Sequence, residues 1–465
     1  MSTQEEGSLK VHRSRSVHRP AVTTDGRNLV SHAGTALLSE LADRTGLTQA
    51  MSGAMADCGI SWHTHDPGVV LTHLAVSIAD GADCLTDFEA LREQPELFGD
   101  VASVSTAWRA VKATASLELR RIPKAVAAAR EIVWAKAPPG DITIDFDATL
   151  LNVHSEKQDA RPTYKKGYGF SPIGAWCDTT DEPLAAMLRP GNAGANDAED
   201  HLELLDQVVA GLPGDYQVGH EPGDDPSLVR RHILVRADSA GASHSFVSGL
   251  VEANIEYSIG HQVSAKVREA LLLFQEEDWV QAIEADGTVR EGAFLAELTP
   301  LMDLSSWGEE ARLIMRRERP HPGAQLSLFD FSEGYRHTCF ITNAPSNDGD
   351  VAVLELRHRG HARVEDRIRN WKDCGLANLP FASFTQNLAW VAASLVAGSL
   401  LAWAQMTCLD NELKKAEPKT LRYRILHVAA VLVRRGRRLV LRLDETWPWA
   451  PALQRAFLKL RSTFP

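Results

Sequence analysis

A change of residue periodicity after Ala137-Pro138-Pro139-Gly140 most limits how this chain of 465 residues can fold. Before it, residues 31 to about 125 repeat apolar side chains at helical spacing. After it, strand-like runs occur at 142–151, 167–176, 182–188 and 231–237, with helical runs at 198–210 and 243–253. This order of elements predicts an α/β core that follows an all-helical region.

The length of the chain requires more than one domain. Residues 259–335 have a mixed, strand-rich pattern broken by glycine and proline, which indicates a subdomain inserted into the core. We therefore expect six segments: a basic flexible arm at 1–30, a helical domain at 31–135, the first part of the core at 136–258, the insertion at 259–335, the second part of the core at 336–410 and a basic helical C-terminal region at 411–465.

The charge of the chain is unevenly distributed. Its net charge is −12 at pH 7, which opposes binding to a polyanion over most of the surface. From Arg357 to the end, however, 19 Lys and Arg residues stand against 8 Asp and Glu residues, a local balance of +11. This region can form a basic surface on an acidic protein, and an ordinary solvated face is the alternative.

Two further features bear on where the protein works. Six cysteines without a C-x-x-C pair argue against a zinc site or a disulfide framework and fit a reducing cytoplasm. The apolar run from Leu388 to Ala404 is long enough to span a membrane, but polar residues precede and interrupt it. We expect a buried core helix at this run and no membrane partner.

Three acidic residues occupy ends of the expected core strands. Asp145 and Asp147 alternate on the first strand, so both side chains point to one face. Asp147 lies nearer the carboxyl end, where ligand sites of open α/β sheets collect. Asp238 ends the apolar strand 233–237, and Ser239-Ala240-Gly241 turns the chain directly afterwards. A cap of the next helix is the alternative role for Asp238.

A fourth acidic residue lies on a helix expected from about Val351 to Cys374, which Asp350 caps and Gly375 ends. At about 100° per residue, four polar residues share one narrow stripe of this helix. The stripe consists of His358, His361, Glu365 and Lys372. A neighbouring apolar stripe would seat the helix on the core. An amphipathic surface helix with ordinary ion pairs is the alternative.

Together these segments resemble the bacterial insertion-sequence transposases of the DDE type, whose signature helix carries a tyrosine, an arginine, a glutamate and a lysine. The resemblance covers roughly residues 30–465 and rests on 144–150, 188–193, 235–239, 361–368 and 421–426. It implies an RNase H-like α/β catalytic core with a strand-rich insertion. It also implies a helical DNA-binding domain at 31–135 and a helical C-terminal tail.

The resemblance carries roles to individual positions. Asp147, Asp238 and Glu365 match the three catalytic, metal-binding carboxylates, and the local match leaves Asp145 as an alternative for the first. Lys372 matches the signature lysine. His358 and His361 stand where the family has tyrosine and arginine, which puts the usual phosphate contacts in question. The expected DNA-binding residues are Lys372, His358, His361, Arg363, Arg367 and Trp279, the last in relatives an insertion tryptophan that stacks on a flipped base.

Three carboxylates on rigid elements can hold two divalent ions about 3.5 to 4 Å apart for phosphoryl transfer. Magnesium suits such an all-oxygen site, and manganese could substitute. The resemblance implies cleavage at transposon ends and strand transfer into target DNA. The partners would be double-stranded DNA and a second copy in a homodimer, in a cytoplasmic, nucleoid-associated location. The alternatives are an RNase H-like nuclease without strand transfer and a catalytically inactive, transposase-derived DNA-binding protein.

Overall fold

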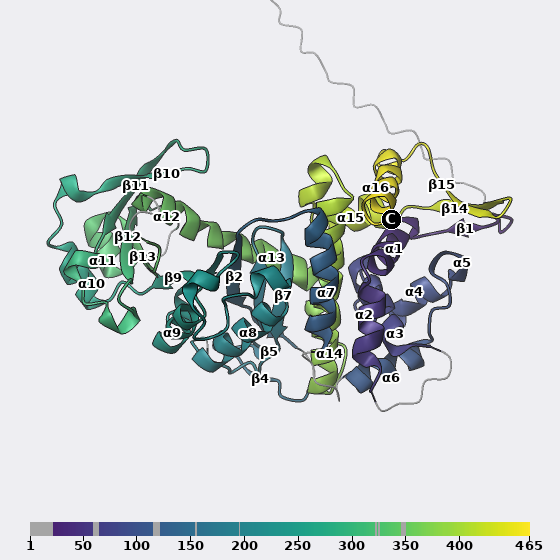
Figure 1. Cartoon of the computed structure of the whole chain (residues 1–465), viewed down its shortest axis with the longest axis horizontal. Helices are drawn as coiled ribbons and strands as arrows, with labels where there is room; N and C mark the ends of the chain where they lie inside the picture. Colours follow the sequence, from purple (N-terminus) through teal and green to yellow (C-terminus); the bar gives the residue numbers. More distant parts are fainter. Residues whose placement is uncertain are drawn as a thin grey trace, which may run out of the picture.

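The computed structural model describes residues 22–58, 65–114, 121–153, 156–194, 196–320, 323, 326–345 and 350–465. Most of the basic arm expected at 1–30 therefore lies outside the described residues. The molecule is elongated (Figure 1). The strand-rich insertion forms one end, the α/β core lies in the middle, and the N-terminal helices form the other end together with the C-terminal elements.

The core is the RNase H-like α/β fold expected from the sequence. Its central strands β2 (Ile142–Ala148), β8 (Ile233–Ala237) and β9 (Glu256–His261) are parallel neighbours. On the other side of β2, β6 (Ile173–Cys177) and β7 (Glu182–Met187) continue the sheet in antiparallel pairing. The order β7-β6-β2-β8-β9, with only the last three parallel, is the RNase H-like arrangement.

Helices cover both faces of this sheet, which is why strand β8 is buried along its whole length. On one face, Phe146 contacts Phe246 of α9 (His244–Glu252), beside α8 (Ala198–Ala210). On the opposite face, Trp176 contacts Trp371 of α13 (Val364–Trp371). Side chains alternate along β2, so Asp145 and Asp147 point to the α13 face.

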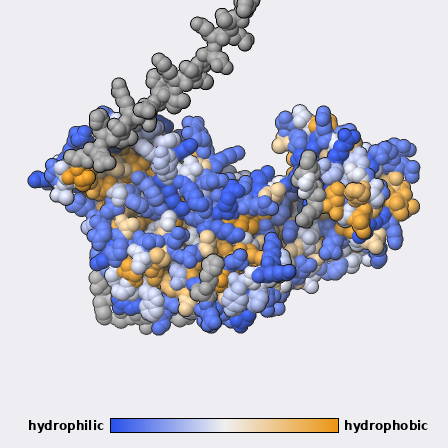
Figure 2. All heavy atoms as spheres, turned by 180° about the vertical axis from the view of Figure 1, so that it is seen from behind, coloured by the Kyte–Doolittle hydropathy of each residue, from blue (hydrophilic) through white to orange (hydrophobic). Residues whose placement is uncertain are grey.

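The insertion extends the core sheet rather than forming a separate one. Strands β10 (Val280–Ile283), β11 (Val289–Glu297), β12 (Arg312–Glu318) and β13 (Arg336–Thr342) add antiparallel to the edge of β9, which gives nine strands in the described part of the chain. β13, expected in the second part of the core, thus belongs to the extension. The small helices α10 (Ala265–Leu271) and α11 (Leu328–Glu333) flank it. Exposed apolar side chains occur on this lobe, Leu272, Leu328 and Phe331 among them (Figure 2).

The helix expected at 351–374 is interrupted. It consists of α12 (Val351–Arg359), a 3-10 turn at Gly360–Arg363, α13 and a π-turn at Lys372–Leu376. Arg236 causes the interruption, because its guanidinium donates a hydrogen bond of 2.7 Å to the Arg357 carbonyl that a regular helix would use internally. A Cβ on Gly360 would lie 2.4 Å from the same guanidinium, so only glycine leaves room for it.

Seven helices in the described part of the chain precede the core. They are α1 (Ala36–Arg44), α2 (Leu47–Met55), α3 (Pro67–Asp80), α4 (Glu89–Arg92), α5 (Pro95–Phe98), α6 (Val104–Thr114) and α7 (Arg121–Lys136). The long helix α14 (Phe384–Thr407) packs between this region and β7. Among the described residues, α14 is the single helix that is both long enough and apolar enough to cross a membrane. Within its most apolar stretch, 78% of the residues are buried. α14 is therefore a core helix here, as expected.

The C-terminal region is helical only in part. The short helix α15 (Pro418–Leu421) and the terminal helix α16 (Ala450–Thr463) flank a hairpin of β14 (Ala430–Arg435) and β15 (Arg438–Leu443), and β14 also pairs with β1 (Leu29–Val30). The helical tail expected from the sequence needs this correction. The hairpin turns at Gly436, whose φ of 61° favours glycine, and the flanking β-branched and leucine residues alternate along both strands.

Candidate active site

The structure brings Asp147, Asp238 and Glu365 together at one edge of the sheet. Because Phe146 of β2 lies beside Ala237 of β8, the next residues, Asp147 and Asp238, end the two parallel strands side by side. Glu365 is in the first turn of α13, which packs on β2. The charges of Asp238 and Glu365 both act on the Asp147 carboxyl group. Residues 91 and 127 positions apart in the sequence thus meet at one place.

Burial and neighbouring charges perturb the Asp147 carboxyl group. Burial and the negative charge of Asp238 raise its pKa to about 6, with a smaller contribution from Glu365, and His361 opposes the rise without cancelling it. Backbone amides orient the two aspartates: Ala148 donates to Asp147 over 2.7 Å, and Ala240 donates to Asp238 over 2.9 Å. Crowded carboxylates of this kind have the donor chemistry that hard divalent cations take.

Asp145 shares the face of Asp147 but is fully buried and neutralised. Arg236 donates to both of its carboxylate oxygens, over 2.8 and 2.9 Å. The His361 Nδ1 lies 2.9 Å from one oxygen, and Arg367 lies 3.4 Å from the other. A carboxylate enclosed by three basic side chains has little capacity left for a cation. The geometry therefore favours Asp147 as the first carboxylate.

The two arginines expected to bind DNA have different surroundings. Arg367 is only 6% exposed and pairs with Asp145, Asp178 and Asp181, so it supports the core from within. The side chain of Arg363 is 58% exposed and pairs with Asp178. Burial works against the charge of Asp178, but the bond from Arg363 and the charge of Arg367 hold the pKa of Asp178 well below its usual range. Of the two arginines, Arg363 is the one on the surface.

The two histidines at the family's tyrosine and arginine positions point inward. The ring of His358 stacks on Phe340, with centroids 4.2 Å apart, and its Nδ1 lies 2.9 Å from the Ser258 hydroxyl. Burial and the nearby charge of His361 lower the pKa of His358 to about 3, so its ring is neutral. His361 faces Asp145. The stripe expected for this helix crosses the 3-10 turn at Gly360–Arg363, and its first two members, His358 and His361, are the ones that lie against the core.

Lys372 follows α13 and is partly buried near Asp147. Burial and the nearby Lys165 lower its pKa, whereas Asp147 acts in the opposite direction. Lys165 lies in the loop between β4 (Arg161–Pro162) and β5 (Tyr168–Phe170), which pair in a small sheet with β3 (Leu151–Asn152). Its ammonium lies over the ring of Tyr164, which is 76% exposed.

The sequence analysis did not identify this loop as a candidate DNA-binding segment, although Tyr164-Lys165-Lys166 combines an aromatic residue with two basic residues. Tyr168, on the strand that follows, is also exposed, at 41%. From the sequence alone the run has the composition of an ordinary turn. In the fold, Lys165 lies close enough to Lys372 to affect its pKa. We call residues 164–168 the basic loop.

The two tryptophans of the insertion also differ. Trp279 is partly buried and covered by the Arg317 guanidinium, 4.1 Å from its ring centroid. Trp307 lies between His244, which begins α9, and His261, which ends β9, with ring centroids 4.0 and 5.5 Å away. Because Asp238 precedes α9 in the chain, Trp307 lies against the start of the helix that follows the second carboxylate.

Comparison with known proteins gives a family match over almost the whole chain. A family model described as "Transposase DDE domain group 1" matches residues 12–464. No curated protein matches the sequence. Among solved structures, the chain is similar to a piggyBac transposase in a synaptic complex with hairpin DNA, with 9% identity, coverage of 86% of this chain and 81% of the other, and a TM-score of 0.42.

Proposed function

Because the chain belongs to the transposase DDE domain group 1 family, we propose that it is a cut-and-paste DNA transposase with Asp147, Asp238 and Glu365 as its catalytic carboxylates. The observation that carries this proposal is their convergence: Asp147 and Asp238 lie at the ends of two neighbouring parallel strands, and Glu365 is in the first turn of the helix that packs on the first of these strands. A protein that kept the family's fold but not its chemistry would gain nothing from three like charges held near one another.

The residues present fit a pair of divalent ions. Asp147, Asp238 and Glu365 would hold them, with magnesium as the expected metal and manganese as a substitute. Bound there, the metals would activate the attacking oxygen and stabilise the leaving oxygen of an in-line phosphoryl transfer. With a pKa of about 6, Asp147 is mainly ionised at neutral pH and is ready to act as a ligand.

The proposed reaction proceeds through one site. Water attacks a phosphodiester bond at a transposon end, and the cleavage leaves a 3'-hydroxyl and a 5'-phosphate. The 3'-hydroxyl then attacks a phosphodiester of the target DNA, so that a new phosphodiester bond forms, the target bond breaks and a target 3'-hydroxyl is released. The chain's own task is to hold these groups in line, because positioning accounts for much of such catalysis. The partners would be double-stranded DNA ends, target DNA and a second copy of the chain, in the bacterial cytoplasm.

Lys372 and the basic loop are the groups we propose for holding the DNA end. Lys372 is close enough to Asp147 to interact with it electrostatically, and Lys165 and Tyr164 continue the positive, aromatic surface outward. Such a combination binds backbone phosphates and stacks on bases without sequence preference. Trp307 would then be the stacking residue of the insertion in place of Trp279, whose ring Arg317 already covers.

The test uses DNA duplexes that carry the inverted repeats flanking the gene. With Mg²⁺, the wild-type chain should nick the end and join it to a plasmid. Glu365→Gln keeps size but removes a ligand charge, so both products should be lost while end binding stays near normal. Asp366→Asn is the matched control, because Asp366 is exposed and pairs only locally with Arg369. Cleavage without joined product would instead favour a nuclease, and cleavage by Glu365→Gln would remove the proposed site.

A further inference from the structure

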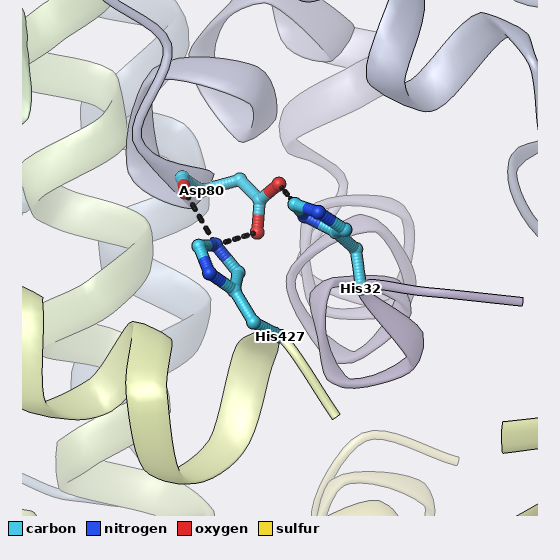
Figure 3. A group of neighbouring side chains, drawn as sticks. All are labelled: His32, Asp80 and His427. Carbon is cyan, nitrogen blue, oxygen red and sulfur yellow. Dashed lines mark hydrogen bonds and ion pairs between the residues drawn. The ribbon is translucent and has the colours of Figure 1, made fainter. Parts of the chain in front are cut away.

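A second cluster of side chains that could ligate a metal consists of His32, Asp80 and His427 (Figure 3). The His32 Nδ1 lies 2.5 Å from one carboxylate oxygen of Asp80, and the His427 Nε2 lies 3.2 Å from the other. The ligating atoms of all three residues are within 4.8 Å of one another. The three residues come from segments that are widely separated in the sequence.

Three different elements direct these side chains to one point. Strand β1 pairs with β14, and the Ala33 amide donates to the Val428 carbonyl over 2.9 Å, so His32 and His427 lie at the same end of this pair. Asp80 is the last residue of α3. The backbone of His32 is left-handed, with φ 55° and ψ 31°, a conformation that is uncommon outside glycine. This conformation aims the His32 imidazole at the buried Asp80 carboxylate.

Hydrogen bonding explains part of the arrangement. Thr35 donates to one oxygen of Asp80, and the His427 Nε2 lies 2.8 Å from the Asp80 carbonyl. The two imidazole rings, however, are only 4.3 Å apart. Both rings therefore converge on the one Asp80 carboxylate, and a metal ion there would replace the ring proton that now makes each hydrogen bond.

We propose that His32, Asp80 and His427 form a structural binding site for a divalent transition metal of the zinc class. Two imidazole nitrogens and one carboxylate oxygen are a common ligand set for Zn²⁺, which binds both at about 2.0 to 2.2 Å. In a tetrahedron this places ligand atoms about 3.4 Å apart, within the range of separations seen here. The cysteine pattern led us to expect no zinc site, but that argument bears on thiolate ligands alone, and residues so far apart in sequence offer no spacing motif.

The site is open to the solvent on one side. The side chains of His32 and His427 are 28% and 38% exposed, while that of Asp80 is 5% exposed. An ion can therefore enter without unfolding the chain, and water can complete its coordination. Once bound, the metal would fasten the β1 and β14 segments to the end of α3, across 347 residues of sequence. Its role would be structural: it would hold β1, β14 and the end of α3 together.

The experiment titrates ZnCl₂ into the full-length, metal-stripped chain at pH 7.5, in competition with a chromophoric chelator. Excess Mg²⁺ is present and the chain carries Asp238→Asn, so that the three carboxylates do not take up zinc. We expect one equivalent bound with a Kd of about 1 µM or tighter. His32→Ala and His427→Gln should weaken this binding at least about thirtyfold. His427→Gln retains a hydrogen-bond donor toward Asp80, and His232→Ala, at an exposed histidine, is the control that should bind normally.

Co²⁺ provides a second readout on the same proteins. A tetrahedral Co²⁺ site with nitrogen ligands gives visible absorption bands, which should appear in the parent chain and disappear in His32→Ala. Absence of a tight Zn²⁺ equivalent in the parent chain would overturn the proposal and leave a hydrogen-bonded His-Asp-His group. Retention of that equivalent in both histidine variants would overturn it as well, because the metal would then be bound elsewhere.

Discussion

Replacing Asp147 by Asn should stabilise the metal-free protein. The pKa of Asp147 rises from 3.8 to about 6 in the folded chain, because burial and the charge of Asp238 disfavour its ionised form. The folded chain therefore binds this proton more tightly than the unfolded chain does. Folding stability consequently falls as the pH rises from 3.8 to about 6, and the full loss is present above that range. Asparagine has the same shape and no charge, so it removes this loss.

The magnitude follows from the size of the pKa change. A rise of about two pH units corresponds to about 3 kcal/mol, and the partial exposure of Asp147 makes this an upper value. We expect the unfolding midpoint of Asp147→Asn to exceed that of the wild type by a few degrees at pH 8 in EDTA. The difference should shrink toward zero near pH 4. Added Mg²⁺ should raise the midpoint of the wild type but not that of the variant.

Asp145→Asn is the matched control, since it makes the same chemical change two residues away on the same strand. Asp145 is fully buried and bound by Arg236 on both oxygens, so its removal leaves a buried guanidinium without its partner. We expect a destabilisation of about 3 to 5 kcal/mol. Thermal unfolding followed by tryptophan fluorescence at several pH values decides the matter. If Asp147→Asn is no more stable than the wild type at pH 8, or if its advantage persists at pH 4, the electrostatic argument for the trio is wrong.

Three further predictions concern the surroundings of the trio. Lys372→Ala and Lys165→Ala should each weaken end binding and reduce the slope of log affinity against log salt by about one phosphate contact, and an unchanged slope would assign them to a solvated face. Gly260→Ala should lower the rate of DNA cleavage while changing the unfolding midpoint little, because the added Cβ would lie 2.9 Å from the Ser239 amide nitrogen, next to Asp238. A normal cleavage rate would show that the turn after Asp238 can shift to make room. Trp307→Ala should reduce cleavage at least tenfold more than Trp279→Ala does, and a 2-aminopurine probe at the cut site would report the lost stacking.

The sequence predicted the positions of the acidic residues best where the alternation of side chains along a strand determines their direction. Alternation on the first strand correctly placed Asp145 and Asp147 on one face, and the strand that ends at Ala237 put Asp238 at the edge of the sheet. Position on the strand favoured Asp147, but local pattern left Asp145 as an alternative because both side chains face α13. The difference comes from Arg236, whose side chain reaches Asp145 only after β8 pairs with β2.

The same long-range contact explains why the sequence predicts one continuous helix at 351–374, whereas the structure has an interrupted one. A bond from Arg236 to the Arg357 carbonyl breaks the helix more than one hundred residues away in the sequence, and helical periodicity carries no sign of it. The C-terminal hairpin was missed for a related reason. Its first strand is completed by Leu29–Val30 from the opposite end of the chain, so the partner that makes the strand favourable lies outside any local window.

The pairing of β1 with β14 also sets an order of events during synthesis. Helix α3 leaves the ribosome more than three hundred residues before α14, the helix that buries it. The interval between the synthesis of β1 and that of its partner strand β14 is longer still. Throughout that interval the apolar faces of the N-terminal helices are without their final cover and are open to chaperones or to aggregation. A polypeptide released early, before residue 430, would keep Asp147, Asp238 and Glu365 and still lack the last strands that pair with its N-terminal segment. Premature termination should thus yield an insoluble product rather than a smaller active enzyme.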